Sequence, residues 1–191
     1  MAGDHERPVR SDAHRNRQRL LEVARRSFSS GGDRVTLEGI AREAGVGIGT
    51  LYRHFPTREA LVEAVHRAEL TRLCDSASEL LATQEADAAL RAWMDRFADY
   101  IATKREMADA LRTVIASGAI TWSQSREQMS AAVQLMLDAG AAAGTLRDDV
   151  RAEDVVASLV GTFLACKQPQ QRDQARRMLD LLVDAVRRHD Q

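Results

Sequence analysis

The sequence is poor in proline, poor in aromatic residues and without long hydrophobic runs. With 3 Pro in 191 residues, long stretches can be helical. Aromatic residues make up only 4% and β-branched runs are few, so an extensive β architecture is not expected. No window of about 18 apolar residues occurs, so no membrane span is predicted. The N-terminus lacks the apolar segment of a signal peptide, and Cys74 and Cys166 form no metal or redox spacing. We therefore expect a folded cytoplasmic protein with reduced thiols.

Charge is distributed unevenly along the chain, although the net charge is only −1. Residues 1–60 carry a net charge of +3, and residues 61–191 carry a net charge of −4. A mildly basic head on an acidic body suits binding to a polyanion, and a chance imbalance is the alternative. Charge alone therefore leaves nucleic-acid binding open.

Apolar residues recur at helical spacing, which predicts an all-α fold of about nine helices without strands. The first helix is expected to follow a frayed polar arm over residues 1–11 and to end near Gly31. Thr36 suits the N-cap of a short second helix that ends at Gly45, and Thr57 suits that of a fourth. A third short helix is expected at about Ile48–His54, and five more are expected around residues 90–101, 107–115, 129–137, 155–164 and 178–186.

Residues 35–61 carry the pattern of a helix-turn-helix. Two helices of about eight and seven residues flank a turn that contains Gly45 and Gly47. Gly45 can adopt the left-handed conformation that such a turn needs. The second helix of the motif, Ile48–His54, is expected to present its outer face to a DNA major groove.

One set of residues stands at fixed spacing through this motif, without a gap. It comprises Thr36-Leu37, Ile40-Ala41, Ala44-Gly45-Val46, Gly49-Thr50-Leu51-Tyr52, His54-Phe55 and Arg58-Glu59-Ala60-Leu61. In these residues, and roughly over 12–62, the chain resembles the N-terminal domain of the TetR (tetracycline-repressor) family of bacterial regulators. After the flexible arm expected over residues 1–11, the resemblance implies a DNA-binding head over residues 12–58 and a ligand-binding and dimerisation body over residues 59–191.

The resemblance also implies which residues contact DNA. Tyr52 would donate its hydroxyl to a phosphate, and Thr50 and Arg53 would face the groove. The full set is Thr36, Gly47, Ile48, Gly49, Thr50, Tyr52, Arg53, His54 and Arg58. Three of them have a plainer alternative: Tyr52 as a core residue, His54 packed against the first helix, and Arg53 as a solvated charge.

Two positions depart from the family pattern, and the first helix adds a further expectation. Gly47 stands where the family commonly has Ser as N-cap of the recognition helix, which removes a hydroxyl but leaves a tolerable cap. Arg58 stands where the family usually has Lys, and an arginine can also bind phosphate. Arg15, Arg17 and Arg19 form either a solvated helix face or a set of backbone phosphate contacts.

The last two helices, roughly residues 153–167 and 171–189, are expected to form a homodimer with their symmetry mates. The stretch Gly144–Asp149 before them resembles the lead-in to the family's dimerisation helices. The predicted dimer surface comprises Val156, Leu159, Val160, Phe163, Leu179, Leu182, Val183 and Val186. A core within one protomer is the alternative for this stripe.

Aromatic and methionine residues concentrate between the two ends of the chain. Such side chains suit an adaptable pocket for an apolar or aromatic ligand, and plain core is the alternative for each of them. TetR-like proteins usually hold an inducer in this region. The predicted lining comprises Trp93, Phe97, Tyr100, Ile101, Met107, Leu111, Trp122, Met129 and Val133.

Two other function classes compete with this interpretation. A helical metalloenzyme is suggested by Glu63 and His66, which have the Glu-x-x-His spacing of di-iron bundles, but only one such pair occurs. A helical adaptor could instead bind another protein through its apolar stripes. We expect no enzyme, no cofactor and no metal. The expected function is a dimeric repressor that binds a palindromic double-stranded operator and is released by a small-molecule inducer, with activation as the alternative mode.

Overall fold

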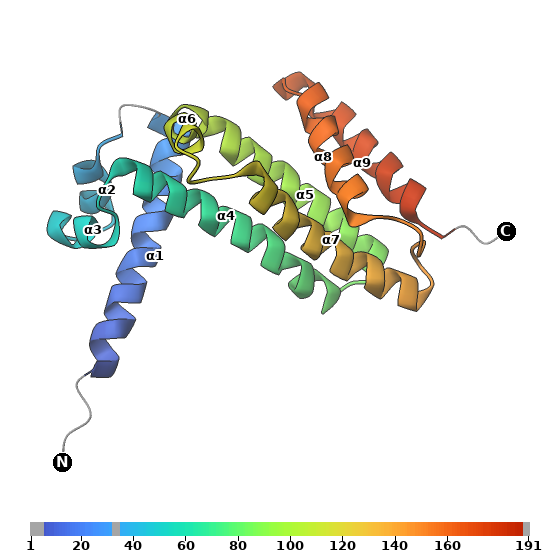
Figure 1. The fold of residues 1–191 in the computed structure, drawn as a ribbon, viewed down its shortest axis with the longest axis horizontal. Helices are drawn as coiled ribbons and strands as arrows, with labels where there is room; N and C mark the ends of the chain where they lie inside the picture. The colour runs from blue at the N-terminus through green and yellow to red at the C-terminus, as the bar shows by residue number, and fades with distance from the viewer. Residues whose placement is uncertain (1–5, 32–34, 189–191) are drawn as a thin grey trace, which may run out of the picture. The chain divides into compact units, whose positions relative to one another are not determined.

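The computed structural model describes residues 6–31 and 35–188 (Figure 1). Within these ranges the chain forms nine α-helices, one short 3-10 helix and no strand, as the all-α prediction required. The helices are α1 (Glu6–Gly31), α2 (Leu37–Glu43), α3 (Ile48–His54), α4 (Arg58–Leu81), α5 (Ala86–Glu106), α6 (Ala108–Ala116), α7 (Trp122–Ala143), α8 (Ala152–Ala165) and α9 (Arg172–Val186), with the 3-10 turn at Pro169–Gln171. No described helix has the length and apolar content needed to cross a bilayer.

Two departures from the expected organisation concern boundaries. Helix α1 already begins at Glu6, so residues 6–11 are helical where the sequence indicated a flexible arm; residues 1–5 of that arm lie outside the described residues. The chain also divides into two compact units, and this division differs from the predicted domain boundary near residue 58. Unit 1 comprises residues up to Ala68 together with Thr103–Ile120, and unit 2 comprises Glu69–Ala102 together with the chain from Thr121.

Unit 1 contains the helix-turn-helix, and its local signals act as predicted. The Thr36 hydroxyl accepts a hydrogen bond of 3.1 Å from the Gly39 backbone N–H and so caps α2. Gly45 has a φ of 64°, the left-handed conformation that the turn between α2 and α3 requires. The Thr57 hydroxyl accepts from the Ala60 N–H at 3.0 Å at the start of α4.

A single hydrophobic core holds unit 1 together. It is built from α1, the two helices of the motif, the first half of α4, and α6. Its buried members include Leu20, Phe28, Ile40, Leu51, Phe55, Leu61, Val65, Met107, Leu111 and Val114. Helix α6 belongs to this unit because its apolar face is covered by these residues.

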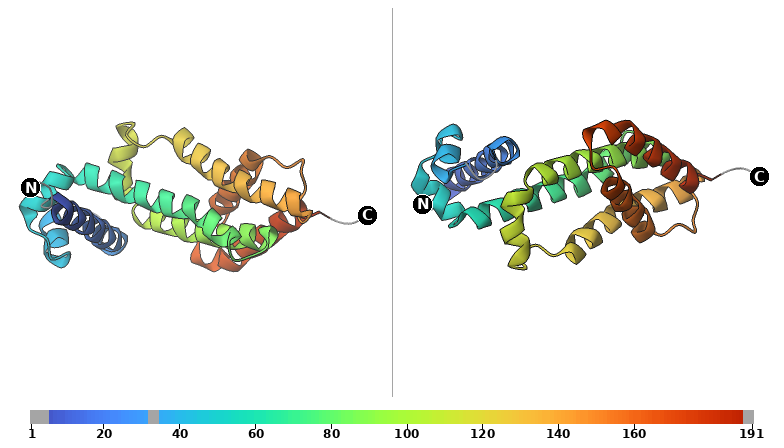
Figure 2. Two further views of the ribbon diagram at one scale, coloured as in Figure 1. Left: turned by 90° about the horizontal axis from the view of Figure 1, so that it is seen from below. Right: turned by 90° about the horizontal axis from the view of Figure 1, so that it is seen from above.

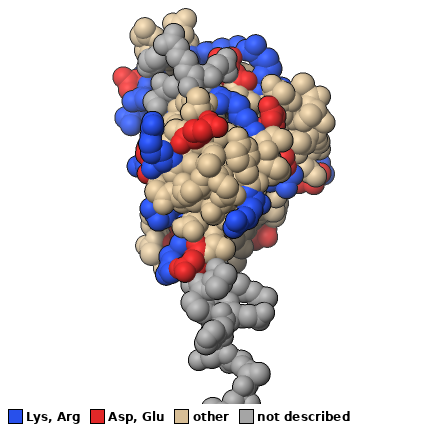
Figure 3. Space-filling view, turned by 90° about the vertical axis from the view of Figure 1, so that its left-hand side faces the viewer, with Lys and Arg blue, Asp and Glu red and all other residues tan. Residues whose placement is uncertain are grey.

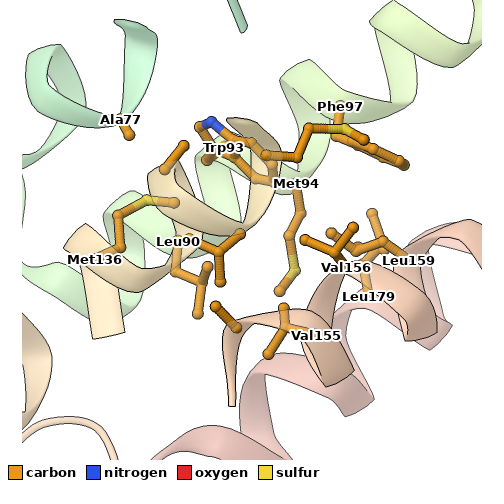
Figure 4. Close-up of a cluster of buried hydrophobic side chains, with 14 of the residues drawn as sticks. Ala77, Leu90, Trp93, Met94, Phe97, Met136, Val155, Val156, Leu159 and Leu179 are labelled. Carbon is orange, nitrogen blue, oxygen red and sulfur yellow. The ribbon is translucent and has the colours of Figure 1, made fainter. Parts of the chain in front are cut away.

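Unit 2 has its own core, in which α5, α7, α8 and α9 direct apolar side chains toward one another (Figure 4). The Trp93 indole is fully buried, and its N–H donates to the Leu73 carbonyl of α4 at 2.9 Å. Helices α8 and α9 lie side by side against the rest of the unit (Figure 2). Gly140 lets Leu146 pack on α7, since a Cβ at that position would lie 2.4 Å from the Leu146 Cγ atom.

Ion pairs attach α9 to α5 within unit 2. Arg91 donates to Asp180 at 2.6 Å, and Arg187 contacts Asp87 at 3.0 Å. The backbone N–H of Arg147 also donates to the Val186 carbonyl at 2.9 Å. The end of the last helix is therefore held by both charged and backbone contacts.

Candidate nucleic-acid interface

Helix α3 buries one face in the core of unit 1 and exposes the other. Leu51 is fully buried, whereas Ile48 is 39% and Tyr52 is 44% exposed. Ile48 and Tyr52 are one turn apart, so the exposed face of α3 carries two neighbouring large apolar side chains. Tyr52 is thus a surface residue of α3, and the core alternative for it is excluded.

Small residues at the start of α3 leave its backbone accessible. Gly47 and Gly49 are exposed, and a Cβ built on Gly49 would meet no atom within 4 Å among the described residues. Gly47 occupies the N-cap position in extended conformation and supplies no side-chain cap, as expected from the missing hydroxyl. A ligand backbone could approach this end of the helix closely.

The charged residues of α3 lie in its last turn, as Arg53 and His54. Arg53 is exposed, and His54 is half-buried with its ring centroid 6.1 Å from that of Phe55. Thr50 is half-buried beside them on the helix. On the side of the molecule seen in Figure 3, basic and acidic side chains both border an uncharged area. The basic side chains are the ones that can bind phosphates around a helix that contacts bases.

The structure places Arg58 differently from the rest of the predicted set. Its guanidinium carbon lies 5.0 Å from the centroid of the Phe28 ring, and Nη1 donates to the Val35 carbonyl. The side chain is half-buried between α1 and the loop before α2. In this position Arg58 braces unit 1. Thr36, by contrast, is exposed while its hydroxyl caps α2.

The predicted pocket residues fall into three groups. One group is buried in the core of unit 2, with Ile101 at its margin: Trp93, Phe97, Tyr100, Met129 and Val133. Met107 and Leu111 are not part of it, because α6 packs into the core of unit 1. Trp122 is 47% exposed at the start of α7. Burial, with Cys74 and Glu69 nearby, raises the pKa of the Tyr100 phenol, so the hydroxyl keeps its proton.

The predicted dimer stripe is mostly the protomer's own core. Only Val160 and Leu182 are half-exposed, and the other six are buried within one chain: Val156, Leu159, Phe163, Leu179, Val183 and Val186. Sequence reasoning missed the apolar residues that these helices do expose, Leu164 at 60% and Leu181 at 68%. Leu181 lies opposite the buried face of α9, and Leu164 lies one turn after the half-exposed Val160, so neither belongs to the fully buried faces of these helices.

The residues of the competing metal hypothesis are engaged otherwise. Glu63 forms an ion pair of 2.6 Å with Arg67. His66 is buried, and its desolvation, with Lys104 and Arg67 nearby, lowers the pKa of the imidazole to about 4. Among the described residues, no three His, Cys, Asp or Glu side chains are grouped as a metal would require.

Comparison with known proteins agrees with this geometry. A family model described as bacterial regulatory proteins of the tetR family matches residues 20–65. A second, described as the C-terminal domain of SbtR-like transcriptional regulators, matches residues 85–188. HTH-type transcriptional regulators of Staphylococcus aureus are 41% identical over 63 residues, which are 32% of this chain. That match spans 34%, about a third, of the length of these curated relatives.

Two crystal structures are similar over nearly the whole chain. A TetR transcriptional regulator from Streptomyces coelicolor is 51% identical, and the match covers 91% of this chain and 99% of that one with a TM-score of 0.80. A TetR transcription regulatory protein from Mycobacterium vanbaalenii is 34% identical, covering 95% of this chain and all (100%) of its own, with a TM-score of 0.73. The two family matches, the helix-turn-helix and these relatives agree: the chain belongs to the TetR family of DNA-binding transcriptional regulators.

Proposed function

We propose that the protein is a dimeric, ligand-responsive repressor that inserts α3 into the major groove of a palindromic operator. The observation that carries this proposal is the outer face of α3. Gly47 and Gly49 leave the backbone open, Ile48 and Tyr52 are exposed, and Arg53 lies in the last turn. A helix-turn-helix presents this face to bases. As a regulator of transcription, the protein would act in the cytoplasm of a bacterium.

Roles at the interface follow from side-chain chemistry. Arg53 can donate two hydrogen bonds to one guanine edge, which selects sequence. Tyr52 can donate to a phosphate, which positions the protein without reading sequence. Ile48 can contact a thymine methyl group. Gly47 and Gly49 allow the phosphate backbone to approach the start of α3. Arg58 would act on DNA only indirectly, by bracing unit 1.

A twofold dimer is proposed because a lone helix-turn-helix has little contact surface. The exposed leucines of α8 and α9, Leu164 and Leu181, supply an apolar centre, and the half-exposed Val160 and Leu182 extend it. Gly161 on α8 is exposed, and a Cβ there would meet no atom of the described residues within 4 Å, so a partner helix can approach closely. A symmetric pair of these faces forms a four-helix bundle.

The proposed inducer site lies in the core of unit 2, around Trp93, Phe97 and Tyr100. Flat rings and methionines there suit an apolar or aromatic molecule. Helix α4 contributes residues to both units, so a ligand that favours one arrangement of unit 2 can shift the helix-turn-helix. A coupling free energy of about 1–3 kcal/mol is enough for a useful response.

Selection from a random duplex library tests the proposed function. The purified protein is expected to enrich a palindromic duplex and to lose affinity for it steeply as salt rises. Apolar aromatic compounds are then screened for release of that duplex. Failure to bind any duplex at any salt concentration would contradict the proposal and favour the protein-binding adaptor.

A further inference from the structure

The arginines of α1 differ in what they contact. Arg15 forms an ion pair with Asp12 on the same helix. Arg25 pairs with Glu22 at 2.9 Å, and Arg26 contacts Glu43 of α2 at 3.4 Å. These three side chains are partly neutralised by the protein itself. Arg17 and Arg19 are both exposed, and neither has an acidic partner in the part of the chain that the structure describes.

Arg17 is held at the C-terminal end of α3. Its guanidinium carbon lies 5.5 Å from the centroid of the Phe55 ring, and Phe55 is the residue that ends α3. Stacking on an aromatic face orients a guanidinium while its N–H groups stay available to an anion. The neighbouring basic residues are Arg53 and His54 of the same turn.

The Arg19 guanidinium lies near the other end of α3. A Cβ built on Gly45 would lie only 2.9 Å from the Arg19 Nη2 atom, so the guanidinium lies over the turn between α2 and α3. Gly45 has the positive φ that this turn needs and no side chain to displace the arginine. Two arginines of one helix therefore stand at the two ends of the recognition helix.

We propose that Arg17 and Arg19 form a second, sequence-independent phosphate-binding site on α1, which acts together with α3. This inference rests on the proposed operator binding. Helix α3 has 7 residues and is thus about 10 Å long. Each DNA strand carries one phosphate per 3.4 Å of rise, so a span of about 10 Å covers roughly three phosphates. The two arginines consequently contact different phosphates, so the contribution of each one to duplex binding can be measured in a single variant.

Salt titration of duplex binding tests the proposal. The variants Arg17→Met and Arg19→Met keep an aliphatic stem on the protein and remove the charge, and Arg15→Met is the matched control on the same helix. Affinity is measured by fluorescence anisotropy on a 30-base-pair duplex of arbitrary sequence, and thermal melting checks that each variant folds. Loss of one phosphate contact lowers the slope of log K against log salt by about one.

The expected result is a slope reduced by about one in each of the two variants, by about two in the double variant, and unchanged for Arg15→Met. The affinity loss should be similar for the selected operator, since phosphate contacts carry no sequence information. Wild-type slopes in the two variants, or an equal loss for Arg15→Met, would overturn the inference while leaving the proposed function intact. A wild-type protein that binds no duplex would overturn both.

Discussion

The Arg58 guanidinium lies over the face of the Phe28 ring, with 5.0 Å between the guanidinium carbon and the ring centroid. The same group donates to the Val35 carbonyl. One side chain thereby joins the start of α4 to α1 and to the loop before α2. This contact gives Arg58 a structural role at a position where the family pattern implies a phosphate contact.

Replacing Arg58 by Ala is expected to lower the free energy of unfolding by about 1–2 kcal/mol, because a cation–π contact and a hydrogen bond are lost. Urea unfolding measures this change. Arg53→Ala, at an exposed position on α3, is the matched control and should leave stability within about 0.5 kcal/mol. An Arg58→Ala protein of unchanged stability that fails to bind DNA would contradict the bracing role.

Substitutions at Tyr52 and Arg53 should separate positioning from sequence reading. Tyr52→Phe removes one hydroxyl and is expected to weaken every duplex alike, by about 1.5 kcal/mol for a hydrogen bond to a charged phosphate. Arg53→Ala is expected to cost about 1–3 kcal/mol on the operator and little on arbitrary duplexes. Parallel anisotropy titrations on both duplexes measure the ratio. A sequence-selective loss from Tyr52→Phe would argue against its phosphate contact.

Leu181→Glu is expected to separate the proposed dimer into monomers. With 68% of Leu181 exposed in one protomer, the twofold face would bury two unpaired carboxylates and lose about 3 kcal/mol or more. Sedimentation velocity measures the change in mass. Leu135→Glu, at an exposed leucine of α7, is the control and should remain dimeric. A dimer that persists in Leu181→Glu would exclude this face.

His66 should make the stability of the protein depend on pH. Its pKa is about 4 when folded and about 6.5 when unfolded, so the unfolded chain binds the proton first as pH falls. The free energy of unfolding is therefore expected to drop between about pH 6.5 and pH 4, by on the order of 2–3 kcal/mol. Urea unfolding across this range measures the loss.

The variant His66→Gln should show a flatter pH profile over the same window. His14→Gln, at an exposed position of α1, is the control and should keep the wild-type profile. If His66→Gln lost stability with pH as the wild type does, another group would have to be responsible.

Local signals predicted the helix-turn-helix because the chemistry that ends its helices is local. The Thr36 cap and the positive φ of Gly45 depend on residues only a few positions away. The same holds for α3, whose buried Leu51 and exposed Tyr52 follow from helical period alone. Arg58 could not be placed this way, since its ring partner lies 30 positions earlier and no short-range pattern pairs them.

Periodicity identifies a buried face but not the element that covers it. The predicted pocket joins Met107 and Leu111 to Trp93 because aromatic and methionine residues concentrate in this part of the chain, yet α6 is covered by residues of unit 1. The strongest apolar stripe of α8 and α9 likewise became the core of a single chain, and Leu164 and Leu181 stay exposed for the proposed contact with a partner. Both outcomes depend on tertiary packing, which a single helical period does not encode.

Hydroxyl-radical footprinting of the wild-type protein on its selected duplex is the most direct measurement of the central claim. Two copies of α3 in successive major grooves should protect two symmetric segments, with centres about 10 base pairs or a multiple of that apart. A single protected segment, or an asymmetric pair unrelated to the helical repeat, would contradict a twofold regulator that reads DNA through α3.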